Sequence, residues 1–137
     1  MKALKNKMAF KWLLFLLIFL TACSQPVKEE KINYRQISIE EAKSLMESEE
    51  NYIILDVRTK EEYEEKHIPG AVLVPNEIIG DEEIPELPDK NQMILIYCRS
   101  GNRSKQAAEK LAALGYTNIF EFGGINDWTG EVVSGAE

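Results

Sequence analysis

Two short runs of almost uninterrupted apolar residues restrict the folds open to this chain: Tyr52-Ile53-Ile54-Leu55-Asp56-Val57 and Met93-Ile94-Leu95-Ile96-Tyr97. Each has the length of a strand, and a strand without a polar side is typical of a parallel sheet covered on both faces. Shorter strand patterns occur at residues 35–37, 71–74 and 118–122, with helix patterns between the strands. The sequence therefore predicts an α/β domain with a five-stranded parallel sheet flanked by helices on both faces.

The first two predicted helices begin at capping boxes. Ser38 precedes Glu41 by three residues, and Thr59 precedes Glu62 by the same spacing. In this pattern the hydroxyl caps the amide three residues on, and the carboxylate bonds back to the capping residue. We expect the first of these helices to end near Glu47.

The other predicted helices follow from the spacing of apolar residues and from the positions of prolines. Residues 103–114 place their apolar side chains on one helical face, and Gly115 is suited to end that helix. Three prolines between residues 75 and 88 exclude a long helix there, so we expect one short helical turn near residues 76–79 and a polar loop.

The N-terminal segment has the pattern of an export signal. Residues 1–11 carry four lysines and no acid, and residues 12–20 are all apolar. A basic segment, a short apolar core and small residues before a cleavage site are typical of a secretory signal peptide. Nine apolar residues cross only about half of a hydrocarbon core about 30 Å thick, so a permanent transmembrane helix is the weaker interpretation.

The end of that segment, Leu20-Thr21-Ala22-Cys23, resembles the lipobox of bacterial lipoproteins, in which the cysteine is lipidated and begins the mature chain. The alternative is an ordinary signal peptide with an unrelated cysteine nearby. We predict a signal peptide over residues 1–22, a lipidated Cys23 with a polar tether to residue 33, and one domain over residues 34–137. The domain would lie on the extracytoplasmic side of the cell membrane.

Charge and cysteine content narrow the functions of the exported form. Loss of the four lysines of residues 1–22 changes the net charge from −7 to −11, which argues against nucleic acid as a partner. With Cys23 lipidated, Cys98 is the only remaining thiol. It is therefore either an inert buried side chain or a reactive group.

Cys98 begins the segment Cys98-Arg99-Ser100-Gly101-Asn102-Arg103-Ser104, between a predicted buried strand and a helix. Successive backbone amides in such a loop can surround an anion, and glycine permits the tight path. Together with the two arginines, the amides should lower the pKa of the thiol and favour thiolate. They would also stabilise a persulfide, whose outer sulfur carries negative charge.

Four segments in order resemble the single-domain rhodaneses over about residues 34–128. They are Leu55-Asp56-Val57-Arg58, His67-Ile68-Pro69-Gly70-Ala71, the loop from Cys98 to Arg103, and Gly123-Gly124-Ile125-Asn126-Asp127-Trp128. The resemblance implies a sulfurtransferase in which Cys98 takes a sulfane sulfur from thiosulfate or a similar small anion. A thiol, cyanide or a thioredoxin-like protein would accept the sulfur. No cofactor is implied.

By its match to the family loop, Arg103 is implied in donor binding. Arg99 lies nearby in sequence, and the amides of Ser100, Gly101, Asn102 and Ser104 would form the anion cradle.

Two other classes use a similar loop. In a cysteine phosphatase or arsenate reductase the cysteine and arginine are one residue further apart than Cys98 and Arg103, which have four residues between them. The shorter spacing favours a ring around a single sulfur. A binding or redox-sensing module with the rhodanese shape is the second alternative.

Several residues are given structural interpretations. His67 is predicted to hydrogen-bond within a turn. Asp56 and Arg58, at the end of a strand, have two interpretations: side chains that reach the site, or a pair that orders the loop behind it. Trp128 is expected in the core or over the end of the domain. The acidic run Glu61, Glu62, Glu64 and Glu65 is predicted to be a solvated helix face, with no metal site.

Overall fold

The computed structural model describes residues 33–136. The predicted signal peptide, Cys23 and almost all of the predicted tether lie outside these residues. None of the helices within residues 33–136 has both the length and the apolar character needed to cross a membrane.

The described residues form one five-stranded sheet, in which every strand pairing is parallel. The strand order is β1-β5-β4-β2-β3. The strands are β1 (Arg35–Gln36), β2 (Tyr52–Asp56), β3 (Val72–Leu73), β4 (Met93–Cys98) and β5 (Ile119–Gly124). The predicted α/β class and five-stranded parallel sheet are confirmed, because each apolar run became a strand.

Within residues 33–136, three α-helices and one short 3-10 helix connect the strands, and a second 3-10 helix follows the last strand. They are α2 (Ile39–Ser48), α3 (Lys60–Glu65), η1 (Asn76–Ile78), α4 (Asn102–Ala113) and η2 (Ile125–Asp127). Both predicted capping boxes are present, at Ser38 with Glu41 and at Thr59 with Glu62. Gly115 follows α4 with φ +94°, the left-handed conformation that glycine adopts at low cost.

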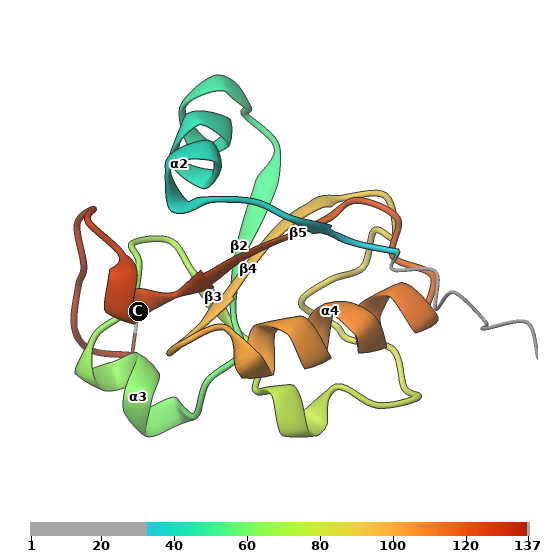
Figure 1. Ribbon diagram of the computed structural model, residues 1–137. Coiled ribbons are helices and arrows are strands. Elements are labelled where there is room, and N and C mark those ends of the chain that lie inside the picture. The colour runs from blue at the N-terminus through green and yellow to red at the C-terminus, as the bar shows by residue number, and fades with distance from the viewer. Residues whose placement is uncertain (1–32, 137) are drawn as a thin grey trace, which may run out of the picture. The chain divides into compact units, whose positions relative to one another are not determined.

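The sheet separates two apolar clusters, and helices cover both faces (Figure 1). One cluster joins β2, β4 and β5 to α4 and contains Leu55, Ile96, Cys98 and Leu111. The other joins the opposite face of the same strands to α2 and α3. Side chains alternate between the faces of a strand, so Cys98 and Glu121 point to the α4 side, while Tyr97 and Phe122 point away.

Candidate active site

Cys98 is the last residue of β4, a central strand of the sheet. The chain leaves the sheet there, turns through three residues, and enters α4 at Asn102. Gly101 makes this turn with φ +107°, a backbone conformation that other residues rarely adopt. The loop therefore places Cys98 at the carboxyl edge of the sheet, where parallel α/β proteins bind their ligands.

Backbone amides and one hydroxyl surround the sulfur of Cys98. The amide of Gly101 donates to Sγ at 3.0 Å, and the amides of Ser100 and Ser104 also act on it. The Ser104 hydroxyl oxygen lies 3.4 Å from Sγ. Burial raises the pKa of the thiol, but the Ser104 hydroxyl and these three amides outweigh burial, and the pKa lies below its usual value. The sulfur is buried, and its environment stabilises the thiolate.

The cradle contains most of the residues predicted for it. Ser100, Gly101 and Ser104 contribute amides toward the sulfur. Asn102, predicted as a fourth amide donor, begins α4 and has an exposed side chain. The Ser104 hydroxyl was not anticipated, because the sequence does not show which way this side chain points at the start of a helix.

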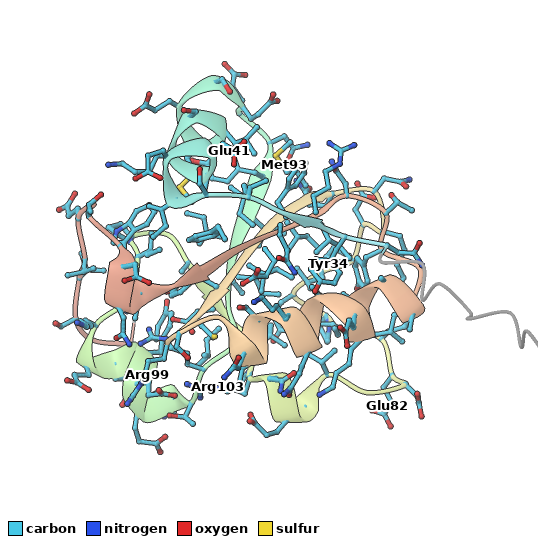
Figure 2. All side chains as sticks on the ribbon, viewed as in Figure 1. Tyr34, Glu41, Glu82, Met93, Arg99 and Arg103 are labelled. Carbon is cyan, nitrogen blue, oxygen red and sulfur yellow. The ribbon has the colours of Figure 1, made fainter. Side chains whose placement is uncertain are left out.

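The two arginines of the loop converge on one carboxylate. Figure 2 labels Arg99 and Arg103, which both lie beside α3. Arg103 donates two hydrogen bonds to Glu62, of 2.7 and 2.9 Å, and Arg99 contacts Glu62 Oε1 at 2.8 Å. Arg103 is thus held at the edge of the loop by α3, with its side chain about a quarter exposed.

The prediction of a solvated acidic face on α3 was wrong for Glu62. Its side chain is only 12% exposed, because it lies under both guanidinium groups. Glu62 also accepts a hydrogen bond from the amide of Thr59 as part of the capping box. The error has a physical reason: one turn of a six-residue helix faces the loop, and only the tertiary structure decides which glutamate occupies that turn.

We expect Glu62→Gln to destabilise the protein by about 1–2 kcal/mol at neutral pH. Hydrogen bonds from Arg103 lower the pKa of Glu62 from 4.5 to about 2. A carboxylate whose pKa is lower in the folded state than in the unfolded state stabilises the protein at pH values above its unfolded-state pKa. For Glu62 this stabilisation is lost as the pH falls from about 4.5 to about 2. Urea unfolding should therefore show a difference between parent and variant that shrinks over this pH range.

Glu61→Gln is the matched control, since Glu61 is the exposed neighbour of Glu62 on the same helix. The free energy of unfolding of this control should stay within about 0.5 kcal/mol of the parent value. A pH-independent difference for Glu62→Gln would contradict the assigned ion pair.

Gly124 of strand β5 lies directly against the backbone of the loop that follows Cys98. This residue pairs with Cys98 in the sheet, where the register between β4 and β5 is irregular. A Cβ at Gly124 would overlap the backbone of Arg99 and lie 2.6 Å from the Ser100 nitrogen. The predicted motif at residues 123–128 thus contains a glycine that lets strand and loop touch backbone to backbone.

Asp56 and Arg58 form a buried ion pair, which agrees with the second of their two interpretations. The two side chains meet at 2.6 Å, and both are almost fully buried. Tyr97 donates to Asp56 at 2.6 Å, and Arg58 donates to the carbonyl of Lys66 at 2.7 Å. Nearby, His67 is buried, contacts the Tyr63 carbonyl through Nδ1 at 2.8 Å and stacks on the Tyr63 ring. These groups join β2, β4 and the turn after α3.

Among residues 33–136, no three side chains of histidine, cysteine, aspartate or glutamate lie close enough together to hold a metal ion. The site chemistry of the described residues is that of a thiol, amides, a hydroxyl and charged side chains.

These features define a class: a parallel α/β domain whose central strand delivers a cysteine into a short anion-binding loop. The family model of the rhodanese-like domain matches residues 38–131. The chain belongs to the rhodanese-like family.

Two relatives illustrate the family membership. The chain is 37% identical over 73 residues to the thiosulfate sulfurtransferase PspE of Escherichia coli, a match that covers 53% of this chain and 70% of PspE. It is 38% identical over 116 residues to the putative sulfur carrier protein YrkF of Bacillus subtilis. That match covers 82% of this chain and 60% of YrkF, so the chain spans less than two thirds of the second protein.

Solved structures agree on the fold. A rhodanese with anions from E. coli is 34% identical with a TM-score of 0.57, over 61% of this chain and 99% of the other. A rhodanese-like domain protein from Staphylococcus aureus is 31% identical with a TM-score of 0.64, over 74% and 99% of the two chains.

Proposed function

We propose that this protein is a sulfurtransferase that takes a sulfane sulfur from thiosulfate, or a similar small anion, and carries it as a persulfide on Cys98. The observation that carries the proposal is the ring of polar groups around the Cys98 sulfur: the hydroxyl of Ser104 and the amides of Ser100, Gly101 and Ser104, which together lower the pKa of the thiol. A thiolate needs such donors, and so does the terminal sulfur of a persulfide. Relatives that are named thiosulfate sulfurtransferases, at 37% and 33% identity, support the same activity.

In the first half-reaction the Cys98 thiolate attacks the outer sulfur of thiosulfate. A bond forms between Cys98 Sγ and that sulfur, the sulfur–sulfur bond of thiosulfate breaks, and sulfite leaves with the electron pair. The product is the Cys98 persulfide anion, so the charge is balanced without a proton. In the second half-reaction cyanide or a thiolate attacks the outer sulfur, and the Cys98 thiolate is regenerated.

The arginines have a role in donor binding under this proposal. Thiosulfate carries two negative charges, and the guanidinium groups of Arg99 and Arg103 lie at the rim of the loop. Glu62 neutralises part of their charge and holds them in place. The sulfonate end of the donor would bind at this rim, and its outer sulfur would face Cys98.

Intact-mass spectrometry tests the persulfide directly. Treatment of the reduced domain with thiosulfate should add the mass of one sulfur atom, and cyanide or dithiothreitol should remove it. Peptide mapping should place the sulfur on Cys98. A domain that turns thiosulfate over with no sulfur adduct at Cys98 would contradict the proposed intermediate.

We also propose that the mature protein is attached to the outer face of the cell membrane through a lipid on Cys23. The support is the sequence pattern at residues 12–23, which lies outside the described residues. A thiol acceptor, such as a thioredoxin-like protein, would then approach the loop from the extracytoplasmic side.

We expect Cys23→Ala to move the protein from the membrane fraction to the soluble fraction, because the substitution removes the lipid attachment atom. Immunoblotting of separated membranes gives the measurement. Cys98→Ala is the matched control and should stay with the membrane. Retention of Cys23→Ala in the membrane fraction would favour an uncleaved apolar helix instead.

A further inference from the structure

Glu62 occupies the two arginines that the proposed sulfur exchange uses to bind its donor. Arg103 donates to both carboxylate oxygens, at 2.7 and 2.9 Å, and Arg99 Nη2 lies 2.8 Å from Oε1. The Glu62 side chain is 12% exposed, so it lies between the two guanidinium groups and largely out of bulk water. A donor that reaches the rim of the loop therefore meets two arginines whose charge is already half neutralised.

The charges at the rim balance when Cys98 is a thiolate. Arg99 and Arg103 contribute two positive charges, and Glu62 and the Cys98 thiolate contribute two negative charges. Hydrogen bonds from Arg103 lower the pKa of Glu62 to about 2, so this carboxylate is ionised at neutral pH. Glu77, in η1, also acts electrostatically on Arg103 and adds negative charge. The rim therefore offers little net attraction to a donor that carries two negative charges.

The other charged groups near the loop do not change this balance. A hollow beside the loop is lined by Arg99 together with Glu65 and Lys66, whose charges are opposite. The buried ion pair at the end of β2 is neutral in itself. Glu121 is 3% exposed and lies 2.6 Å from the Ser104 hydroxyl, so it faces that hydroxyl and not the arginines. Among residues 33–136, these groups supply no net positive charge to the rim.

We propose that Glu62 sets the charge selectivity of the site: it disfavours dianionic donors such as thiosulfate relative to singly charged sulfane donors, R–S–S⁻ or R–SO2–S⁻. The inference rests on the proposed sulfurtransferase and concerns the same site. Glu62 acts through the two arginines and the charge at the rim, so it is a specificity-determining residue and not a catalytic one.

Methanethiosulfonate, CH3–SO2–S⁻, is the matched probe for thiosulfate. It has the tetrahedral shape of thiosulfate, with a methyl group in place of one charged oxygen. The Cys98 thiolate attacks its outer sulfur, the sulfur–sulfur bond breaks, and methanesulfinate leaves with the electron pair. Both donors give the same Cys98 persulfide anion, so they differ at the rim by one unit of charge.

The test is the ratio of kcat/KM for thiosulfate to kcat/KM for methanethiosulfonate, with cyanide as the acceptor. In a two-step exchange kcat/KM for the donor reports the first half-reaction, and a change in the thiol itself affects both donors. We expect Glu62→Gln to raise the ratio at least about fivefold at low salt, the effect of one unit charge about 4 Å away even in water. At about 1 M salt, where the screening length is about 3 Å, the ratios of parent and variant should converge.

Two control variants separate charge at this position from geometry and from the net charge of the protein. Glu62→Asp keeps the carboxylate and should keep the parental ratio. Glu61→Gln removes a charge from the exposed neighbouring position, where solvent screens it, and should also keep the parental ratio. An equal rise in Glu62→Gln and Glu62→Asp would give Glu62 a merely geometric role, and an equal rise in Glu61→Gln would trace the effect to net charge. Either result would overturn the proposal.

A salt titration of the parent decides the question even if Glu62→Gln fails to fold. A rim with unneutralised arginines would attract both donors, and added salt would lower kcat/KM about twice as steeply for thiosulfate as for methanethiosulfonate. For the neutralised rim we expect no fall with either donor, and a steep fall with thiosulfate would overturn the proposal. Turnover of neither donor would refute the sulfurtransferase and this proposal together. Active proteins with unchanged ratios would refute the donor selectivity alone.

Discussion

Replacement of Cys98 by serine is expected to lower the rate of sulfur transfer from thiosulfate to cyanide by at least about 10⁴-fold, the order seen when a covalent nucleophile is removed. Serine keeps the shape of the side chain and its hydrogen bonds with the loop amides. Its hydroxyl stays protonated near neutral pH, however, and an oxygen nucleophile cannot form a persulfide. The measurement is the initial rate of thiocyanate formation at saturating thiosulfate.

The fold of Cys98→Ser should survive, because the new hydroxyl remains a partner for the Gly101 amide. We expect the free energy of unfolding to change by no more than about 1.5 kcal/mol. Cys98→Ala serves as a second inactive variant that removes the hydrogen-bonding atom as well. Turnover near the parental rate in either variant would show that the sulfur passes through another group.

Replacement of Gly124 by alanine is expected to lower both the stability of the protein and its rate of sulfur transfer, although this residue contributes no side chain to the site. The added methyl group would overlap the Arg99 carbonyl, and the nearby Ser100 nitrogen could not move away on its own. To relieve the overlap, either β5 moves away from β4 or the loop after Cys98 moves away from β5. Overpacking of this kind costs about 1–3 kcal/mol, and the loop movement would take the Ser100 amide from Cys98.

Thermal unfolding and thiosulfate kinetics measured together test this expectation. Gly80→Ala is the matched control: a Cβ at Gly80 meets no atom within 4 Å, and the backbone there is not in the left-handed region. That variant should keep the stability and the kinetics of the parent. Parental kinetics in Gly124→Ala would mean that the loop does not depend on its contact with β5.

The regular elements followed from local patterns. The apolar run at Met93–Tyr97 became β4, and the capping boxes at Ser38 and Thr59 start helices where predicted. Boundaries moved by one or two residues: β4 includes Cys98, and β5 continues to Gly124. These extensions have a tertiary cause, because the ends of β4 and β5 pair with each other beside the loop.

The site was only partly predictable. Cys98 and the amides after it were recognisable, because successive amides of a glycine-containing loop between a strand and a helix can surround the sulfur of a cysteine at its start. Glu62 was assigned to a solvated face, yet it binds Arg99 and Arg103 from another helix. Glu121 interrupts an apolar strand, which was the one available signal for a buried acid.

Alone, the sequence determined which segments become strands and helices, and that a thiol stands at the end of a central strand, because these properties depend on neighbours along the chain. Only the tertiary structure decided how the acids are used. Glu62 and Glu121 reach the loop across 41 and 17 residues of chain. Packing between elements sets such pairings, and it decides whether an acidic side chain meets water, a guanidinium group or a buried hydroxyl.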